Sequence, residues 1–412
     1  MDKTLWIVSG GVEAVPGIKR AKEMGLRVVV SDMDAEAPGF AFADDRVMAS
    51  TYDAVATAKA AVEYSRKNRP IHGVICIASD VPMTVAKVAS ALGLPGITAD
   101  TAALASDKLA MKRRFVESGI PAPWFSPVES PAHLKEIMKE RGVPLVIKPV
   151  DSRGARGVLR LGPRVDPVWA FGHSIGYSPG RRVMAEEYIE GPQISTESVL
   201  IGGRGYTPGF TDRNYELIDA FAPYMIENGG EQPSVLSEGE RLRVSRMAED
   251  AGRAIGIRTG TVKGDMVLSR SGPMVIEVAA RLSGGWFSTD QIPLATGVDL
   301  VGAAIKLALG EELGEDELAP KHRRGVAIRY FFPRPGRVVD IRNFERLEGV
   351  PWVHRMGFFV KAGDIIEPVT NHTKRAGFVI TKGATRAEAV ERAEEAVREI
   401  VIETRPVEGV ST

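Results

Sequence analysis

Cysteine is almost absent from the chain. Cys76 is the only one among 412 residues, which excludes an intrachain disulfide and any metal site built from several thiolates. The letters around it, GVICIA, are apolar and predict a buried thiol within a strand. Histidine is also scarce, with six in the chain. His322, His354 and His372 do not have the spacing of metal ligands, so we assign none of them to a metal.

Long apolar runs are missing as well. No stretch approaches the roughly 20 residues of a membrane-spanning helix. The beginning of the chain, MDKTLWIVSGG, has a short apolar strand, whereas a secretory signal carries an apolar core of about 7–15 residues. We therefore expect a cytoplasmic protein that neither crosses a membrane nor is secreted.

The chain also lacks an excess of either charge. It has 53 basic and 53 acidic residues and a formal net charge of zero. This balance argues against a protein that coats nucleic acid or holds to a membrane through a polybasic surface. What is present is ordinary for a globular protein, with 44% hydrophobic and 26% charged residues. A chain of this length is expected to form two or three domains.

Strand and helix patterns alternate over the first hundred residues. Apolar strands are predicted at Leu5–Ser9, Arg27–Ser31 and Gly73–Ala78, with a helix after the first and another around Val81–Leu92. Continuous apolar strands separated by helices indicate a parallel sheet covered on both faces. The fold class is therefore α/β in this region.

Two common phosphate-binding motifs are missing. Asp32 ends the second strand, where dinucleotide enzymes place a ribose-binding acid, but the loop SGGVEAVPG lacks the G-x-G-x-x-G spacing. The Walker motif G-x-x-x-x-G-K-[ST] is absent too. A substrate pocket at the carboxyl ends of these strands is the better interpretation, and its candidate residues are Ser9, Gly10, Gly11 and Ser79.

The segment TVKGDMVLSRSGPMVIEVAARLSGG is the most informative part of the chain. It predicts two strands, Val262–Leu268 and Pro273–Val278, joined by a Ser-Arg-Ser-Gly turn. Each strand delivers one carboxylate, Asp265 or Glu277. Hard oxygen ligands on a rigid hairpin suit Mg²⁺ that bridges nucleotide phosphates. A surface hairpin with ordinary solvated charges is the alternative.

Cations surround these two acids. Lys263 stands two residues before Asp265, and Arg281 stands four residues after Glu277. Lys108 lies in the first turn of a helix predicted from SDKLAMKRRFVESG, where the helix dipole disfavours a cation. A bound phosphate would explain that position, and a solvated surface lysine is the alternative.

A second lysine precedes a small-residue loop. Lys148 ends the strand of PLVIKP, and the loop that follows offers Ser152, Gly154 and Gly157 together with two arginines. A flexible loop rich in donors is suited to close over phosphates. The next motif, AEEYIEGP, predicts a strand that runs into a short acidic hinge. The hinge can bind an adenine edge through main-chain atoms, or it can be a plain strand end.

Taken in this order, the motifs resemble those of the ATP-grasp superfamily over nearly the whole chain. The resemblance rests on the helix-start lysine, the second lysine 40 residues later, the EEYIEGP hinge, the paired acids followed by E-x-x-x-R and a glycine pair, and TGVDLVGAAIKLALGEEL. EVAARLSGG is most similar to segments of carboxylate–amine ligases of the L-amino-acid ligase kind. The implied fold is ATP-grasp (α/β, with α+β parts), with an N-terminal parallel-sheet domain and a C-terminal mixed strand and helix domain.

The resemblance implies roles for individual residues. Phosphates of ATP would meet Lys108 and Lys148, with Ser152 to Gly157 as the lid. Adenine would lie against the hinge, which consists of Glu186, Glu187, Tyr188 and Ile189. Two Mg²⁺ ions, or Mn²⁺ in their place, would bind Asp265 and Glu277. Arg281, helped by Lys263, would neutralise charge on the transferred phosphoryl group.

Two positions depart from the family pattern. Ala279 stands where many relatives have a metal-binding asparagine, which leaves the second Mg²⁺ with fewer protein oxygens. Gln193 stands where relatives often have a ribose-binding glutamate. The glutamine carbonyl can still accept a hydrogen bond from a ribose hydroxyl.

The predicted function is an ATP-dependent ligase that activates a carboxylate as an acyl phosphate and joins it to an amine. Its partners would be small molecules, and a homodimer through the C-terminal region is compatible with the resemblance. Alternatives are an enzyme that activates bicarbonate or formate for a nucleotide precursor, a nicotinamide oxidoreductase, and a nucleotide-binding protein without catalysis. The missing G-x-G-x-x-G opposes the oxidoreductase, and only Ala279 hints at the last.

The predicted domains are residues 1–105, 106–313 and 314–412, with the middle one divided at residue 185 into a lid-bearing part and a metal-binding part. The polar segment GEDELAPKHRR follows Leu313 and predicts a linker. Strands are expected at GVAIRYFFP, GFFVKAGDII and GFVITKG, followed by a helix with a capping box of Thr385 and Glu388. Substrate contacts are expected to draw on scattered residues, with Arg213, Tyr215, Trp286 and Phe287 as candidates.

Overall fold

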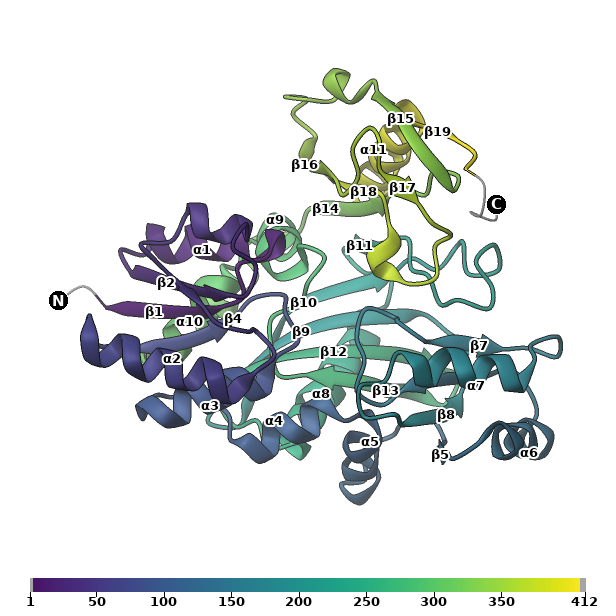
Figure 1. Ribbon diagram of the computed structural model, residues 1–412, viewed down its shortest axis with the longest axis horizontal. Coiled ribbons are helices and arrows are strands. Elements are labelled where there is room, and N and C mark those ends of the chain that lie inside the picture. Colours follow the sequence, from purple (N-terminus) through teal and green to yellow (C-terminus); the bar gives the residue numbers. More distant parts are fainter. Residues whose placement is uncertain (1–2, 408–412) are drawn as a thin grey trace. The chain divides into compact units, whose positions relative to one another are not determined.

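The computed structural model describes residues 3–407 and is shown in Figure 1. The chain forms two compact units, each assembled from three segments. The first holds the residues up to Ala122, then Ile194–Phe210 and Leu236–His322; the second holds Pro123–Gln193, Thr211–Val235 and the residues from Arg323 onward. The three domain limits drawn from the sequence stay a prediction.

A parallel sheet opens the first unit. Its strand order is β3-β2-β1-β4, and every neighbouring pair is parallel. The bounds are β1 Thr4–Val8, β2 Arg27–Asp32, β3 Asp45–Met48 and β4 Gly73–Cys76. The strands expected from the apolar runs are therefore confirmed, apart from a residue or two at their ends.

Helices cover both faces of this sheet because the side chains of each strand are apolar on both sides. On β1, Leu5 and Ile7 pack with α1 and α10, whereas Trp6 and Val8 pack with α2 and α3. Figure 1 shows α1 on one side of β1 and α2 and α3 on the other. The bounds are α1 Val15–Glu23, α2 Ala54–Lys67, α3 Pro82–Leu92 and α10 Leu300–Ala308, with short turns at η1 Val12–Ala14 and η2 Pro38–Ala41.

The rest of the first unit is built on an antiparallel hairpin and its neighbours. The strand order is β13-β12-β9-β10, and α8 packs its buried face onto β12 and β13. The bounds are α4 Ala99–Ser106, α5 Lys108–Glu117, β9 Gln193–Ile201, β10 Arg204–Arg213, α8 Glu238–Ala254, β12 Gly260–Ser269, β13 Gly272–Ala279, η3 Phe287–Gln291, α9 Ile292–Thr296 and η4 Glu315–Leu318.

The second unit begins with a four-stranded antiparallel sheet of order β5-β8-β6-β7. The core between this sheet and helices α6 and α7 includes Leu134, Ile147 and Ala170. The bounds are β5 Phe125–Val128, α6 Pro131–Arg141, β6 Leu145–Pro149, β7 Leu159–Leu161, α7 Pro167–Gly176 and β8 Val183–Glu187.

The remaining strands of the second unit form two sheets. One has the order β11-β14-β18-β16, with the last residues of β10, Asp212 and Arg213, paired to β11, and the other has the order β17-β15-β19. Helix α11 packs on β14 and β18 through alanines such as Ala389 and Ala393. The bounds are β11 Gly230–Gln232, β14 Gly325–Tyr330, β15 Gly336–Arg342, η5 Phe344–Arg346, β16 Val353–Phe358, β17 Ile365–Ile366, η6 His372–Lys374, β18 Gly377–Gly383, α11 Arg386–Glu399 and β19 Val401–Arg405.

Two local expectations for this region need correction. The strand expected over GFFVKAGDII is wrong for most of its length, because β16 ends at Phe358 and a turn with Gly363 at φ +96° separates it from β17. The capping box of α11 is half right. Thr385 does accept the N–H of Glu388, but the Glu388 carboxylate accepts the N–H of Ala384 instead of that of Thr385.

The structure also bears on membrane crossing. Over the described residues, every helix is too short or too polar to span a bilayer.

Candidate active site

The β12–β13 hairpin places its two carboxylates opposite each other. Asp265 is in register with Glu277, and Lys263 is in register with Ala279. Side chains alternate along a strand, so these four project from one face of the hairpin. The opposite face carries apolar residues such as Val262, which join the core beneath α8. One face of the hairpin therefore packs in the core, and the polar side chains project from the other face.

Each of the two acids is paired with a lysine. Lys263 forms an ion pair with Asp265, which also accepts a hydrogen bond of 3.2 Å from Ser195 Oγ. Lys108 Nζ lies 3.4 Å from Glu277 Oε2. Burial disfavours the charged ammonium of Lys108, but neighbouring carboxylates, Glu277 foremost, outweigh burial and raise its pKa. Lys108 therefore remains a cation at neutral pH.

The place of Lys108 follows from local helix capping. The Asp107 side chain accepts the N–H of Ala110 at 2.9 Å and so begins α5 at Lys108. A short separate helix, α4, ends just before it at Ser106. The helix predicted from SDKLAMKRRFVESG, with Lys108 in its first turn, is therefore confirmed, whereas α4 was not predicted.

The paired acids fit a hard divalent cation only in part. Among residues 3–407, no group of three or more His, Cys, Asp and Glu side chains is gathered so that it could hold a metal ion. Ala279 lies two residues beyond Glu277 on the same face of the hairpin, opposite Lys263, and adds no side-chain oxygen. Two carboxylates on rigid strands do suit Mg²⁺ when phosphate and water oxygens complete its coordination. The donor set therefore fits a metal that is shared with a phosphorylated substrate.

Arg281 follows the hairpin and lies against the N-terminal sheet of the same unit. Its Nε lies 3.4 Å from Asp80 Oδ1, and its Nη1 donates to the carbonyl of Leu282 at 3.1 Å. Leu282 in turn forms a parallel bridge with Ile77, just beyond β4. Burial opposes the charge of Arg281, yet nearby carboxylates, Asp80 first, raise its pKa. The guanidinium is held charged at the carboxyl edge of the sheet.

Lys148 and Glu186 form a buried ion pair in the second unit. Lys148 Nζ lies 2.5 Å from Glu186 Oε1, and the two side chains are 4% and 5% exposed. They stand on neighbouring antiparallel strands, β6 and β8. A cation held this firmly at the end of a strand offers a fixed donor to an anion, which a solvated lysine would not.

The predicted adenine hinge lies in the connection from β8 to β9. Glu187 ends β8, and its N–H donates to the carbonyl of Trp124 at 2.9 Å. Tyr188 follows, with the guanidinium of Arg160 centred 5.7 Å from its ring. Gln193 begins β9, and its amide donates to the carbonyl of Ile189 at 3.5 Å. The hinge is therefore a short crossover between two strands, as the sequence predicted.

The loop from Ser152 to Gly157 has an unusual backbone. Gly154, Ala155 and Gly157 all adopt positive φ, at +64°, +58° and +72°. A Cβ on Gly157 would lie 2.9 Å from Pro149 Cγ, so this position needs glycine. The loop is fastened at both ends, because the carbonyl of Gly157 accepts from Ser174 Oγ at 2.7 Å and the carbonyl of Gly154 accepts from the N–H of His372 at 3.1 Å.

Comparison with protein families covers most of the chain. A model of the ATP-grasp N-terminal domain matches residues 18–96, a model of the ATP-grasp domain matches residues 105–285, and a model of the L-amino acid ligase C-terminal domain 2 matches residues 329–405. The chain belongs to the ATP-grasp superfamily. The resemblance inferred from the motifs, and the fold it implied, are confirmed.

Individual ATP-grasp relatives are similar at modest identity. An L-amino acid ligase from Bacillus licheniformis shares the fold with a TM-score of 0.82 at 23% identity, over 98% of this chain and 99% of that one. A Sinorhizobium fredii protein described as uncharacterized protein y4rH is 27% identical over 81% of this chain and 70% of its own length. Carnosine synthase 1 of Gallus gallus is 30% identical over 33% of this chain and 14% of its own length.

The four candidate substrate residues of this ATP-grasp protein fall in two groups. Arg213 binds Glu227, with its Nη2 2.5 Å from Glu227 Oε2, and its guanidinium is centred 5.2 Å from the ring of Tyr215. Trp286 and Phe287 are only 3% and 5% exposed. Phe287 belongs to the core beneath the N-terminal sheet, so a structural role accounts for it.

Glu197 is a site residue that the sequence analysis missed. It lies on β9, is fully buried, and stands close enough to Arg281 for the two charges to affect each other's pKa. Burial raises the pKa of Glu197 to about 7, against the lowering effect of hydrogen bonds from Ser283 and Ser288 and of the Arg281 charge. In the segment QISTESV it stands within the consecutive polar residues Ser195–Ser198, so the pattern carries no signal of its burial.

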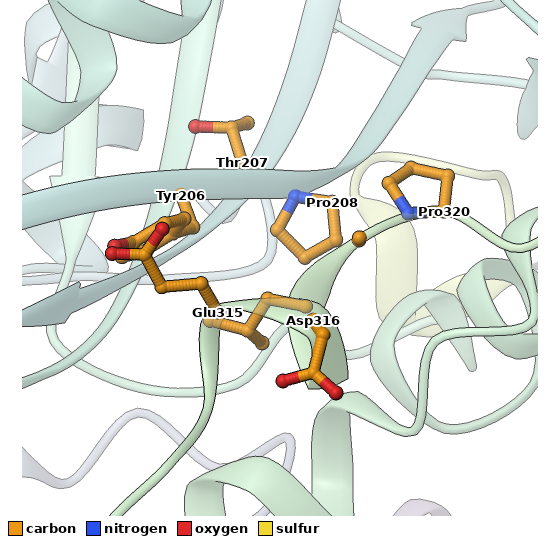
Figure 2. Close-up of a pocket in the computed structure, with 8 residues that line it drawn as sticks. Tyr206, Thr207, Pro208, Glu315, Asp316 and Pro320 are labelled. Carbon is orange, nitrogen blue, oxygen red and sulfur yellow. The ribbon is translucent and has the colours of Figure 1, made fainter.

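A hollow elsewhere in the first unit contains none of these residues. It has a volume of about 430 Å³ and lies between β10 and the η4 segment. Figure 2 shows its labelled lining residues, which are Tyr206, Thr207, Pro208, Glu315, Asp316 and Pro320. An ion pair between Arg204 and Glu315 borders it. We attach no function to this hollow.

Proposed function

We propose that the protein is an ATP-dependent carboxylate–amine ligase. It would transfer the γ-phosphoryl group of ATP to a carboxylate and then join the resulting acyl phosphate to an amine, with release of ADP and phosphate. The observation that carries the proposal is the register pair Asp265 and Glu277, each with its own lysine, in a chain of the ATP-grasp superfamily. The matched L-amino acid ligase C-terminal domain supports amino acids as substrates.

Activation by phosphate solves a chemical difficulty. A carboxylate resists attack by an amine, because its negative charge repels the nucleophile and its oxygen is a poor leaving group. Phosphorylation converts that oxygen into part of a phosphate, which leaves readily. The amine nitrogen then attacks the carbonyl carbon, the C–O bond to phosphate breaks, and a proton leaves the nitrogen to give the amide.

The residues near the phosphates would act through charge and position. Lys108 and Lys148 would hold the phosphate oxygens of ATP, and the loop Ser152–Gly157 would cover them. Asp265 and Glu277 would hold Mg²⁺, which would neutralise part of the charge of the phosphates. Arg281 and Lys263 would stabilise the charge that develops on the transferred group, and each such interaction is typically worth about 10²–10³ in rate.

The base of the nucleotide would lie at the β8–β9 crossover. Main-chain groups from Glu186 to Ile189 would meet the adenine edge, with Tyr188 beside it. Gln193 would accept a hydrogen bond from a ribose hydroxyl. The loop over the phosphates must exclude water during the reaction, because an acyl phosphate in water hydrolyses before the amine can attack.

A phosphate-release screen tests the proposal. The protein is incubated with ATP and Mg²⁺ and with pairs of L-amino acids, and phosphate and ADP are measured. We expect release that requires both an acid and an amine, together with an amide product detected by mass spectrometry. Glu277→Ala serves as the blank and should lower the rate at least about 10²-fold.

The control and the competing functions use the same assay. Glu395→Ala changes an exposed acid on α11 and should leave the rate unchanged. Phosphate release that requires bicarbonate or formate would instead point to the carboxylase or formyl-transfer alternative. No ADP with any acid and amine pair would reject catalysis of ligation and leave a nucleotide-binding protein.

A further inference from the structure

Glu197 makes three hydrogen bonds with one short segment of the first unit. Both of its carboxylate oxygens accept the N–H of Ser283, at 3.2 and 3.1 Å, and one accepts the hydroxyl of Ser288 at 3.0 Å. Ser283 lies in the turn after β13, and Ser288 lies in the π-helical η3 that follows it. One side chain therefore bridges the two ends of the turn.

The same turn carries Arg281 at its start and is held from other directions as well. Glu13 accepts the N–H of Gly285 at 2.8 Å, and Gln291 donates to the carbonyl of Gly285 at 2.7 Å. Trp286 adopts φ +53°, which a bulky residue takes up only when its surroundings impose it. The turn is thus held in one conformation by side chains from several elements.

Burying a carboxylate costs more free energy than is needed to bind one N–H and one hydroxyl. A buried acid loses its hydration, and the neutral amide of glutamine could accept from Ser283 at lower cost. The charge has another partner. Glu197 and Arg281 each affect the other's pKa, while Asp80 approaches the guanidinium at 3.4 Å. Two carboxylates therefore act on one arginine.

We propose that Glu197 is a positioning residue, which fixes the Ser283 turn and thereby aims Arg281 at the phosphoryl group in transfer. Glu197 itself touches no substrate. It acts by holding the backbone that carries Arg281 and by countering the arginine's charge while the phosphoryl group is absent. This inference rests on the proposed function, because it assigns the guanidinium a role in that reaction.

The test pairs kinetics with hydrogen exchange. The rates are measured at pH 8, above the pKa of about 7 that burial gives Glu197, so that the carboxyl is ionised in the wild-type protein. Glu197→Gln then keeps the shape but removes the charge, and we expect kcat for ADP formation to fall about 10²-fold, the cost of a small misplacement of a reacting group. KM for ATP should change little, since Arg281 would act on the transition state. Amides of residues 282–288 should exchange faster than in the wild-type protein, whereas those of β4 should not.

An epistasis experiment separates positioning from general stability. If Glu197 acts through Arg281, Glu197→Gln should add almost nothing in an Arg281→Lys background. Ser288→Ala removes one hydrogen bond and leaves the acid in place, so a smaller loss of kcat is expected. Glu249→Gln is the matched control: this half-buried acid has a raised pKa and accepts from Thr207 at 2.8 Å, and its replacement should leave kcat unchanged.

The experiments distinguish failure of the positioning role of Glu197 from failure of the proposed ligase function. If the wild-type protein forms ADP but Glu197→Gln keeps full kcat, or loses equal factors with and without Arg281, the positioning role is wrong and the ligase proposal stands. If the wild-type protein forms no ADP with any acid and amine, the proposed function is wrong. The exchange of residues 282–288 then still decides whether Glu197 holds the turn.

Discussion

Asp265 and Glu277 occupy one register position of the β12–β13 hairpin, with a lysine paired to each. Opposed carboxylates at this spacing repel each other unless cations lie between or beside them. The lysines reduce this repulsion between the carboxylates in the protein alone, and a bound divalent cation would reduce it further. Under the proposed function, metal binding at this pair would therefore depend on the placement of Lys108 and Lys263.

Replacing one acid tests that link. Asp265→Asn keeps the size of the side chain but halves the charge of the pair, so the Mg²⁺ concentration for half-maximal ADP formation should rise at least about tenfold. A magnesium titration of initial rates measures it. Asp250→Asn changes an exposed acid on α8 and should leave the titration unaltered. Unchanged magnesium dependence in Asp265→Asn would remove this residue from the metal site.

The buried pair of Lys148 and Glu186 predicts a large effect on stability. Lys148→Met leaves the Glu186 carboxylate buried without its cation, which should cost about 3 kcal/mol and lower the melting temperature. Adding Glu186→Gln to that variant should restore much of the loss. Differential scanning calorimetry of the two single variants and the double variant measures the coupling. Additive losses would contradict it.

The backbone of the Ser152–Gly157 loop predicts the outcome of a matched pair of glycine substitutions. Gly157→Ala should destabilise the protein by about 1–3 kcal/mol, because φ is +72° and Pro149 Cγ would lie 2.9 Å from the new Cβ. Gly162→Ala is the control, since its Cβ would meet nothing within 4 Å and its φ is not in the left-handed region. Thermal unfolding compares the two, and equal melting temperatures would contradict the assigned strain.

The raised pKa of Glu197 predicts a pH dependence of stability. The folded state holds this proton up to about pH 7, whereas the unfolded carboxyl loses it near 4.5. Its contribution to stability is therefore complete below about pH 4.5 and is lost as the pH rises through about 7. Glu197→Gln has no ionisable group here. The free energy of unfolding of the variant minus that of the wild type should therefore increase from about pH 5 to pH 8, by roughly 3 kcal/mol at most. Parallel curves for the two proteins would count against the assigned pKa.

Much of the fold could be predicted because its signals are local. The hairpin could be predicted from two apolar runs around a Ser-Arg-Ser-Gly turn, with Asp265 on one strand and Glu277 on the other, whereas their shared register comes from the structure. The N-terminal parallel sheet could be predicted because strands that are buried on both faces have continuous apolar runs in the sequence. In each case a short stretch of sequence contains the physical cause of the structure.

Other features depend on partners far away in the chain. Glu197 belongs to the candidate site because Ser283 and Ser288, from a segment about ninety residues later, donate hydrogen bonds to it, and no pattern within β9 predicts that contact. The stretch from Gly357 to Ile366 is apolar at both ends, and this pattern predicts one strand. Gly363 at φ +96° breaks it, and glycine alone does not reveal which sign of φ it adopts.

The burial of Cys76 has a practical consequence. The thiol is 5% exposed, and burial raises its pKa to about 12, so reactive thiolate is scarce. Because no other cysteine exists in the chain, a cysteine introduced at an exposed position would be the one site that takes a maleimide dye. A single fluorophore could thus be attached at a chosen exposed position without first replacing Cys76.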